Sequence, residues 1–334
     1  MLRRNFLLLI TILALLIIKI KCVNFLEIVT KFWSIGQNRL KYEMPNHEIL
    51  HSNYDFIVIG AGSAGCAIAS RLSENPKWNI LLLEAGDSEN FLMDIPMLVH
   101  FLQAYDVNWR YKTEPSKTSC LGMNGNQCNW PRGKVMGGSS VLNYMVYTRG
   151  HPKDFDNWGK TLGNDGWDFK NVSYYYRRME NNVVPSATLD YHGKSGPITV
   201  SESTFKSPVA RAFIAAGKEM GFPYVDYNGP NQMGFSYLQA TIENGIRKSS
   251  NAAYLYPVKH RKNLHVKKNS RVTKLLIDDN KKVYGVRFYS NGKYYSVNAT
   301  KEVILSAGAI NSPQILMLSG IGPRKHLESL GIKT

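Results

Sequence analysis

Cysteine is scarce in this sequence, and its spacing excludes a zinc site of the common kind. Only four cysteines occur among 334 residues. There is no CxxC pair, and no pair of histidines follows a cysteine at ligand spacing, so we predict no metal centre. Cys120 and Cys128 enclose a short loop rich in glycine and asparagine that can close on itself as a disulfide. Cys66 falls in a predicted buried helix, where a thiol packs as a small hydrophobic side chain.

Acidic residues are too few to balance the basic ones. The chain has 41 Lys and Arg against 25 Asp and Glu, which gives a net charge of +16. Such an excess favours anionic partners, among them acidic glycans, membrane surfaces and nucleic acid. However, the densest basic run, KHRKNLHVKK at 259–268, lacks the interleaved aromatic residues that bind single strands. We therefore predict a solvated face at this run and no nucleic-acid partner.

The N-terminal hydrophobic stretch is too short for a typical membrane span of ~20 residues. It runs from Phe6 to Ile18 after two arginines, and its length is that of a secretory signal core, ~7–15 residues. Because residues 20–22 do not form a small-x-small cleavage pattern, we predict that residues 1–22 are a signal peptide or an uncleaved signal anchor. The protein is accordingly expected to be secreted or membrane-anchored at this end. Two acceptor sequons, at Asn171 and Asn298, would then carry glycans.

The clearest local motif begins at residue 54, where the sequence reads YDFIVIGAGSAGCAIASRLSENPKWNILLLEAG. An apolar run ends in GAGSAG, a helical pattern follows, and a second apolar run ends at Glu84. This strand–helix–strand order is typical of dinucleotide binding. In such a unit Gly60 permits the tight turn, Gly62 lets the backbone approach a pyrophosphate, and Gly65 allows the helix to pack on the strand.

This unit supplies the first group of candidate cofactor-binding residues. The helix N terminus offers free N–H groups and positive partial charge to the phosphates. Glu84 ends the second strand, where an acidic residue accepts hydrogen bonds from ribose hydroxyls. The unit alone does not distinguish NAD from FAD. Its candidate residues are Gly60, Gly62, Ser63, Ala64, Gly65 and Glu84.

Two longer stretches carry a resemblance to a known family. GKVMGGSSVLNYMVYTRG at 133–150, preceded by NWPR, and GAINSPQILMLSGIG at 308–322 resemble the two signatures of the glucose-methanol-choline (GMC) family of FAD-dependent oxidoreductases. Shorter similarities occur at 106–115, 191–200 and 244–257. The resemblance spans Tyr54 to Thr334 and corresponds to the N-terminal portion of a typical member. The loop between Cys120 and Cys128 and the secretory start are most similar to the insect branch, typified by glucose dehydrogenases.

The resemblance implies FAD as cofactor and a second group of binding residues. Gly137 and Gly138 would admit the flavin and its phosphate tail, Ser139 would bind a phosphate oxygen, and Asn143 and its neighbours would run along the ring edge. The backbone of Val272 would contact the adenine, although ordinary core packing also explains a strand valine. The complete group implied by the resemblance is Val135, Gly137, Gly138, Ser139, Asn143, Tyr144, Met145, Val146 and Val272.

The predicted fold class is α/β, with a discontinuous Rossmann-like FAD-binding domain and an inserted, incomplete substrate domain. We predict the first part of the FAD-binding domain at 50–150, a substrate-domain segment at 151–240, and the rest of the FAD-binding domain at 241–334. Helical patterns are present at 171–182 and 207–221, and the first is expected to pack Tyr174, Tyr175 and Tyr176 against the protein. Predicted strands lie at 54–60, 79–84, 264–268, 271–278, 283–289, 293–298 and 301–306.

The activity implied by the resemblance is oxidation of the CH–OH group of a small-molecule alcohol or sugar. Hydride would pass to flavin N5, and oxygen or a quinone would accept the electrons. Members of the family use a histidine near their C terminus as the base, so the catalytic residues are expected beyond Thr334 and the 334 residues alone are expected to be inactive. A short, non-catalytic FAD-binding relative and an NAD-dependent dehydrogenase are the alternatives. The histidines present match no catalytic position of the family and are interpreted as surface or structural: His47, His51, His100, His151, His192, His260, His265 and His326.

Overall fold

The computed structural model describes residues 43–47, 51–188 and 190–334. Residues Met44–Thr334 form one compact unit. The signal segment predicted at 1–22 lies outside the described residues. Among the helices of the described part, none has the length and apolar character needed to cross a bilayer.

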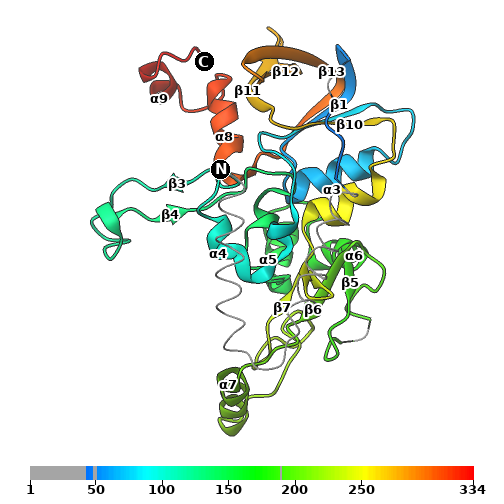
Figure 1. Cartoon of the computed structure of the whole chain (residues 1–334), viewed down its shortest axis with the longest axis vertical. Helices are drawn as coiled ribbons and strands as arrows, with labels where there is room; N and C mark the ends of the chain where they lie inside the picture. The colour runs from blue at the N-terminus through cyan, green and yellow to red at the C-terminus, as the bar shows by residue number, and fades with distance from the viewer. Residues whose placement is uncertain (1–42, 48–50, 189) are drawn as a thin grey trace, which may run out of the picture. The chain divides into compact units, whose positions relative to one another are not determined.

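A six-stranded sheet in the order β10-β2-β1-β13-β12-β11 organises this unit (Figure 1). The first four strands in that order run parallel, and β12 and β11 continue the sheet in antiparallel fashion. The sheet joins the start of the unit to its end, and its class is the Rossmann-like α/β class predicted from the sequence. Its strands are β1 (Asn53–Ile59), β2 (Ile80–Leu83), β10 (Leu264–Lys267), β11 (Arg271–Ile277), β12 (Val283–Ser290) and β13 (Lys293–Leu305).

One strand prediction is wrong, because 293–298 and 301–306 are a single strand. The N-terminal part of β13 pairs with β12, and its C-terminal part pairs with β1. Asn298 lies at the junction, opposite both Gly285 and Asn53. Pairing with a neighbour on each side satisfies the backbone there, and this tertiary context overrides the local preference.

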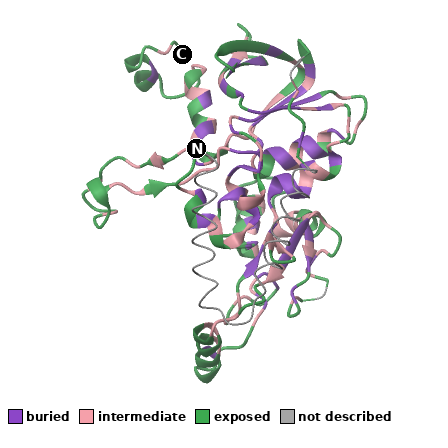
Figure 2. Cartoon of the chain, viewed as in Figure 1, coloured by how far each residue is buried: buried purple, intermediate pink, exposed green. Residues whose placement is uncertain are grey.

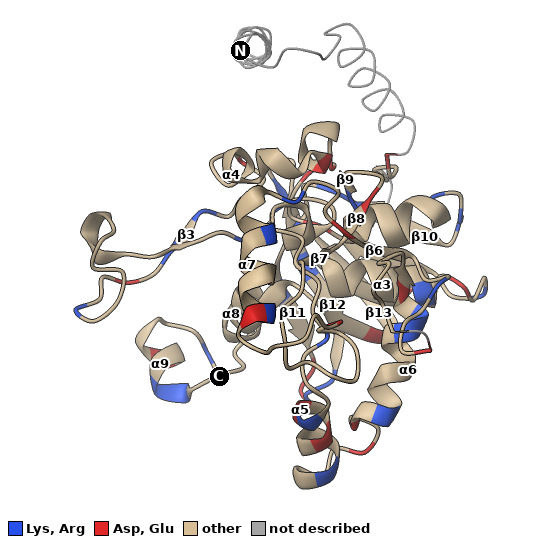
Figure 3. Cartoon of the chain, turned by 90° about the horizontal axis from the view of Figure 1, so that it is seen from below, with Lys and Arg blue, Asp and Glu red and all other residues tan. Residues whose placement is uncertain are grey.

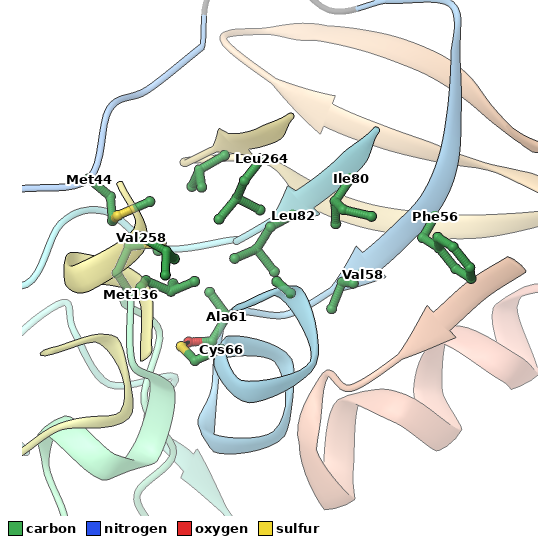
Figure 4. Packing of buried hydrophobic residues seen from close by; sticks show 13 residues of the cluster. Met44, Phe56, Val58, Ala61, Cys66, Ile80, Leu82, Met136, Val258 and Leu264 are labelled. Carbon is green, nitrogen blue, oxygen red and sulfur yellow. Dashed lines mark hydrogen bonds between the residues drawn. The ribbon is translucent and has the colours of Figure 1, made fainter. Parts of the chain in front are cut away.

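Alternate side chains of β1 enter two different hydrophobic clusters. Phe56 and Val58 pack with the helix that follows β1, in the cluster drawn in Figure 4. Ile57 and Ile59 pack in a second cluster with residues of β11, β12 and β13. A strand buried on both faces reads as a continuous apolar run, as FIVI does here. In Figure 2 the helix α7 (Pro208–Glu219) is mostly green, because it is exposed along most of its length.

The three predicted helices begin and end close to their predicted positions, whereas the other four α-helices of the described residues were not predicted. The helical patterns at 171–182 and 207–221 correspond to α6 and α7. Asp168 caps α6 by accepting from the Asn171 N–H, and Ser207 caps α7 in the same way. The α-helices are α3 (Ser63–Leu72), α4 (Val99–Leu102), α5 (Pro152–Asp156), α6 (Phe169–Met179), α7 (Pro208–Glu219), α8 (Gly308–Leu318) and α9 (Arg324–Ser329).

The expected packing of the three adjacent tyrosines of α6 is wrong for two of them. Tyr174 and Tyr175 are 54% and 63% exposed. Only Tyr176 turns inward, where its ring lies 5.5 Å from the guanidinium carbon of Arg149. Successive helix positions point in different directions, so one packed tyrosine leaves its neighbours in solvent.

The remaining strands and tight helices are short. The strands form small sheets: β3 (Tyr111–Lys112) with β4 (Asn129–Trp130), β5 (Glu180–Asn182) with β6 (Ile198–Glu202) and β7 (Gln239–Ala240), and β8 (Ile242–Glu243) with β9 (Ile246–Arg247). The 3₁₀ turns are Phe91–Asp94, Pro96–Leu98, Asn124–Asn126, Gly138–Val141 and Tyr256–Val258, and the π-helical turns are Asn157–Thr161 and Asn251–Leu255.

The β3–β4 hairpin carries the predicted disulfide. Cys120 and Cys128 are bonded, with Cα atoms 5.4 Å apart, which confirms the pairing. Cys66 is also placed as predicted, as a free thiol of α3 that is buried in the core. Its Sγ donates to the carbonyl oxygen of Ala61, 3.1 Å away (Figure 4).

The basic run at 259–268 is not the predicted solvated face. Lys267 and Lys268 are buried in and just after β10. The Lys268 Nζ donates to the Met44 carbonyl and to the Ser88 hydroxyl. The long aliphatic stems let these cations reach internal acceptors, so the run serves packing as well as solubility. Elsewhere Lys and Arg are spread over several elements, as Figure 3 shows.

A buried ionic network holds together the segment between the two parts of the large sheet. Arg149 forms an ion pair with Glu180, and the two ring nitrogens of His192 lie 2.9 Å from Glu180 Oε1 and 2.7 Å from Asp226 Oδ2. Burial lowers the pKa of His192, but its hydrogen bonds to Asp226 and Glu180 outweigh this, and the pKa is raised above the ordinary value. His192 is therefore structural, as the sequence predicts.

Replacing His192 should destabilise the fold in a pH-dependent way. We expect His192→Gln to lower the free energy of unfolding at pH 6 by about 3 kcal/mol, because the buried Asp226 carboxylate loses its cationic partner and Glu180 keeps only Arg149. Since the folded pKa is raised, the stabilisation is fully present below pH 6.5 and is lost as the pH rises through the folded pKa. Urea titrations of the two proteins between pH 5.5 and about 9 measure this. The exposed His326→Gln is the control, and equal losses in both variants would contradict the account.

Candidate functional site

A cavity of about 810 Å³ opens at the carboxyl ends of the parallel strands. Residues after β1, β2 and β13 line it, and β2 and β13 flank β1 on opposite sides. In open α/β sheets, ligands bind at the carboxyl ends of the strands, at the point where the chain connections on the two sides of one strand lead in opposite directions. The predicted binding residues that line the cavity are Gly60, Gly62, Ser63, Ala64, Glu84, Gly138, Ser139 and Val272.

The other predicted residues lie behind or beyond the cavity wall. Gly65 packs α3 against β1, and Val135 is buried in a small cluster with Val141 and Leu142. Gly137 has φ +93°, and an added Cβ would lie 2.8 Å from a methyl group of Val141. The remaining four, Asn143, Tyr144, Met145 and Val146, continue the chain past the 3₁₀ turn Gly138–Val141.

Two glycines of the first turn are required by the protein itself. Gly60 has φ +94°, a conformation that favours glycine, and an added Cβ would lie 2.7 Å from the Ser306 carbonyl oxygen. At Gly65 an added Cβ would lie 1.9 Å from the Gly60 carbonyl oxygen. The turn and the packing of α3 on the strand therefore need no ligand to explain their glycines.

Gly62 differs, because no contact of the protein requires a glycine there. Its φ of −81° suits any residue, and the nearest atom to an added Cβ is the Gly138 Cα, 4.0 Å away. The reverse is not true, since a Cβ on Gly138 would lie only 2.6 Å from the Gly62 Cα. A glycine at 62 thus leaves open space on the cavity side, next to a place where two distant segments meet.

The N terminus of α3 lies at this same place. Gly62 is its N-cap residue, and no side chain caps the helix. Ser63 and Ala64, in its first turn, line the cavity. An uncapped helix start has unpaired N–H groups and positive partial charge, so this part of the wall suits an anion such as a phosphate.

Glu84 contributes a buried carboxylate to the wall. Its two oxygens accept hydrogen bonds from the N–H groups of Ala61 and Gly86, each at 2.8 Å. Burial raises the pKa of Glu84 to about 7, against the opposing effect of these hydrogen bonds. Each oxygen has a further lone pair, so the carboxylate can also accept from hydroxyl groups of a ligand.

Several lining residues were not predicted. Trp109 and Tyr111 are stacked, with ring centroids 5.8 Å apart, and the Tyr111 hydroxyl accepts from Asn311 Nδ2 at 2.8 Å. Arg132 and Ser306 also line the cavity. The signal was available, because Trp109, Tyr111 and Asn311 lie in stretches that resemble the GMC family and Arg132 lies in the NWPR that precedes its first signature. Aromatic and cationic side chains there suit a planar ring and a phosphate.

Within the described part of the chain, the cavity lining contains no histidine and no cluster of metal-ligating side chains. None of the eight histidines, all of which are described, lines it. Across residues 43–47, 51–188 and 190–334, no group of three or more His, Cys, Asp or Glu side chains could hold a metal ion.

Comparisons with known proteins agree on one family. The sequence profile described as GMC oxidoreductase matches residues 54–333. Glucose dehydrogenase [FAD, quinone] of Drosophila pseudoobscura pseudoobscura is 45% identical over 284 residues, which cover 84% of this chain and 45% of that protein. Oxygen-dependent choline dehydrogenase of Staphylococcus saprophyticus is 43% identical, covering 85% of this chain and 50% of that one.

Solved structures agree with the sequence matches. The crystal structure of pyridoxine 4-oxidase from Mesorbium loti superposes with a TM-score of 0.77 at 34% identity and covers 84% of this chain and 54% of that chain. An Aspergillus oryzae formate oxidase superposes with a TM-score of 0.73 at 29% identity and covers 85% and 50%. The chain therefore spans about half the length of the relatives it matches.

The raised pKa of Glu84 predicts a pH effect on stability. A carboxyl group with a folded pKa of about 7 and an ordinary value of 4.5 binds its proton more tightly in the folded state. Its contribution is therefore most favourable below pH 4.5 and is lost as the pH rises to about 7. In Glu84→Gln, which cannot ionise, this loss should be absent.

Chemical unfolding at several pH values measures this effect. The free energy of unfolding of the wild type relative to Glu84→Gln should fall by about 3 kcal/mol between pH 4.5 and 7.5. The exposed Glu328→Gln should stay within about 0.5 kcal/mol of the wild type throughout. A constant difference between the wild type and Glu84→Gln would contradict the assignment of this pKa.

Proposed function

Because the chain belongs to the GMC oxidoreductase family, we propose that it binds FAD in the cavity at the carboxyl end of β1. We propose that the protein oxidises the CH–OH group of an alcohol or sugar, with oxygen or a quinone as electron acceptor. The names of the relatives support this, since they include a glucose dehydrogenase [FAD, quinone] and an oxygen-dependent choline dehydrogenase. FAD, when bound, supplies the hydride acceptor.

The observation that carries the proposal is the open space at Gly62. Neither backbone conformation nor protein contact requires a glycine there, whereas a pyrophosphate lying on the start of α3 does. The uncapped helix N terminus beside it supplies N–H groups for the phosphate oxygens. A cavity of about 810 Å³ is also within the range of ~300–1,000 Å³ that small-molecule sites occupy.

The other lining residues have roles that fit the remaining parts of FAD. Glu84 would accept hydrogen bonds from ribose hydroxyls, and Val272 would lie against the adenine. Gly138 and Ser139 would hold the phosphate tail, and the chain from Asn143 to Val146 would follow the flavin ring. Trp109 and Tyr111, with their stacked rings, offer further planar contact surface.

The domain organisation is proposed on the same basis. Strands from 50–150 and from 241–334 belong to one sheet, which supports a single FAD-binding domain made of both segments. The helices α5 to α7 and the sheet β5-β6-β7 lie within 151–240, which we assign to the substrate domain. Secretion or N-terminal membrane anchoring is proposed from the sequence of residues 1–22. The sequon residues Asn171 and Asn298 are exposed, as glycosylation would require.

Substitution of Gly62 tests the proposed cofactor site. In Gly62→Val, the branched side chain would occupy the space proposed for the pyrophosphate, so FAD affinity should fall by at least about a hundredfold, an amount equivalent to about 2.7 kcal/mol. The thermal midpoint of the apoprotein should change little, because nothing in the protein meets the new Cβ. Titration of FAD, followed by flavin absorbance and fluorescence, measures the affinity.

Two further glycines separate cofactor binding from folding. Gly65→Val should unfold the protein, since its Cβ would lie 1.9 Å from the Gly60 carbonyl oxygen. Gly122→Val should bind FAD like the wild type, because a Cβ added there meets no other residue within 4 Å. Full FAD binding by Gly62→Val would sink the proposed site, and a wild-type chain that binds NAD but not FAD would sink the proposed cofactor.

A further inference from the structure

Among the described residues, Arg247, the last residue of β9, has the largest side chain that is almost fully buried. It is 1% exposed, and its guanidinium reaches residues about a hundred or more positions earlier in the chain. Its Nε donates to the Met93 carbonyl at 3.0 Å, and Nη1 donates to the Ser140 carbonyl at 2.9 Å and to Asn143 Oδ1 at 2.8 Å. The guanidinium thus joins the 3₁₀ turn Gly138–Val141 to the residues that follow it.

This contact determines which way the Asn143 amide faces. A guanidinium has only donors, so it requires the oxygen of the amide and not the NH₂ group. The same Oδ1 also accepts from the Met145 N–H at 3.0 Å. Both donors lie on the oxygen side, and within the described residues Nδ2 donates to no protein acceptor while Asn143 itself is exposed. The side-chain N–H donors of Asn143 are therefore available to a ligand outside the loop.

The loop around Asn143 is held in a conformation that it would not adopt alone. Met145 is buried and has φ +61°, a conformation that costs free energy in a residue other than glycine. The Asn143 N–H also bonds back to the Ser139 carbonyl at 3.0 Å, one turn after a residue that lines the cavity. Strain of this kind persists only where surrounding contacts hold it, and Arg247 supplies one of them.

The charge of Arg247 is preserved despite its burial. Burial lowers the pKa of Arg247 to about 10, and the carboxylates of Glu89 and Asp94 oppose that shift. Glu89 is itself fixed by the Ser249 hydroxyl at 2.7 Å and by the Asn251 amide at 2.9 Å. At neutral pH the guanidinium remains protonated and cannot accept a hydrogen bond from Asn143.

We propose that Arg247 is a positioning residue, which holds the Asn143 amide with its N–H donors turned toward the bound flavin. The proposal rests on the proposed function, because it assumes that FAD is the ligand facing this loop. It assigns Arg247 no contact with the cofactor. Its effect on the cofactor passes through Asn143 alone.

A double-mutant cycle on FAD affinity tests this role in the full chain. Arg247→Met should weaken FAD binding about five- to tenfold, the amount expected for one lost hydrogen bond. Any loss of affinity caused by a less stable fold would add to this. In an Asn143→Ala background the same substitution should have little further effect, because there is no amide left to orient. If Arg247 were merely structural, through Met93 and Ser140, the fold-change would be equal in both backgrounds.

A second arm remains informative even if Arg247→Met fails to fold. Asn143→Asp keeps an oxygen for Arg247 and for the Met145 N–H but removes both donors, so it should retain the wild-type thermal midpoint and bind FAD about five- to tenfold more weakly. Asn124→Asp is the matched control, since it makes the same amide-to-acid change at an exposed position on the β3–β4 hairpin, and it should bind FAD normally.

The outcomes separate the two hypotheses. A wild-type chain that binds no FAD would overturn the proposed function itself. Wild-type FAD binding combined with equal fold-changes in the cycle, or with normal binding by Asn143→Asp, would overturn only the positioning role of Arg247.

Discussion

The close approach of two backbone segments, at Gly62 and at Gly138, is the constraint on which the site depends. A single Cβ on Gly138 would lie 2.6 Å from the Gly62 Cα, so the glycine-rich run at 133–150 can approach the turn after β1 only because residue 138 has no side chain. This contact brings the uncapped start of α3 beside Ser139 and the 3₁₀ turn that begins at Gly138. The cavity wall is formed by segments far apart in the sequence, and neither segment could form it alone.

The interior of the sheet makes that contact stable. Val58 and Ile59 pack on opposite faces of β1, and the hydrophobic clusters on both sides fix where the strand ends. Gly60, with φ +94°, then turns the chain beside the carbonyl oxygen of Ser306, the residue that follows the neighbouring strand β13. Away from the sheet, the buried Arg247 links the glycine-rich run to β9 through its hydrogen bond to the Ser140 carbonyl oxygen. The apolar core thus fixes the end of β1, and the end of β1 fixes the turn that lines the cavity.

Much of the fold and of the cavity wall is predictable from the sequence, for physical reasons. The φ of +94° at Gly60 and the contact of Gly65 with the Gly60 carbonyl oxygen both arise within a few residues, so the sequence predicts these two glycines from local backbone geometry. The orientation of Asn143 was not predictable, since it depends on a guanidinium about a hundred residues later in the chain. The continuous strand β13 and the buried Lys268 were missed for the same reason. Their local sequences are polar, and only tertiary partners reveal that they pair or are buried.

Hydrogen–deuterium exchange of the full chain, with and without saturating FAD, tests most directly whether the cavity at the end of β1 is the cofactor site. The account predicts that FAD slows exchange in the peptides covering 60–66, 84–87, 133–140 and 306–312, which surround the cavity. The tip of the β3–β4 hairpin and α7 should exchange equally in both states. Protection confined to other segments, or no protection while FAD is demonstrably bound, would contradict the central claim.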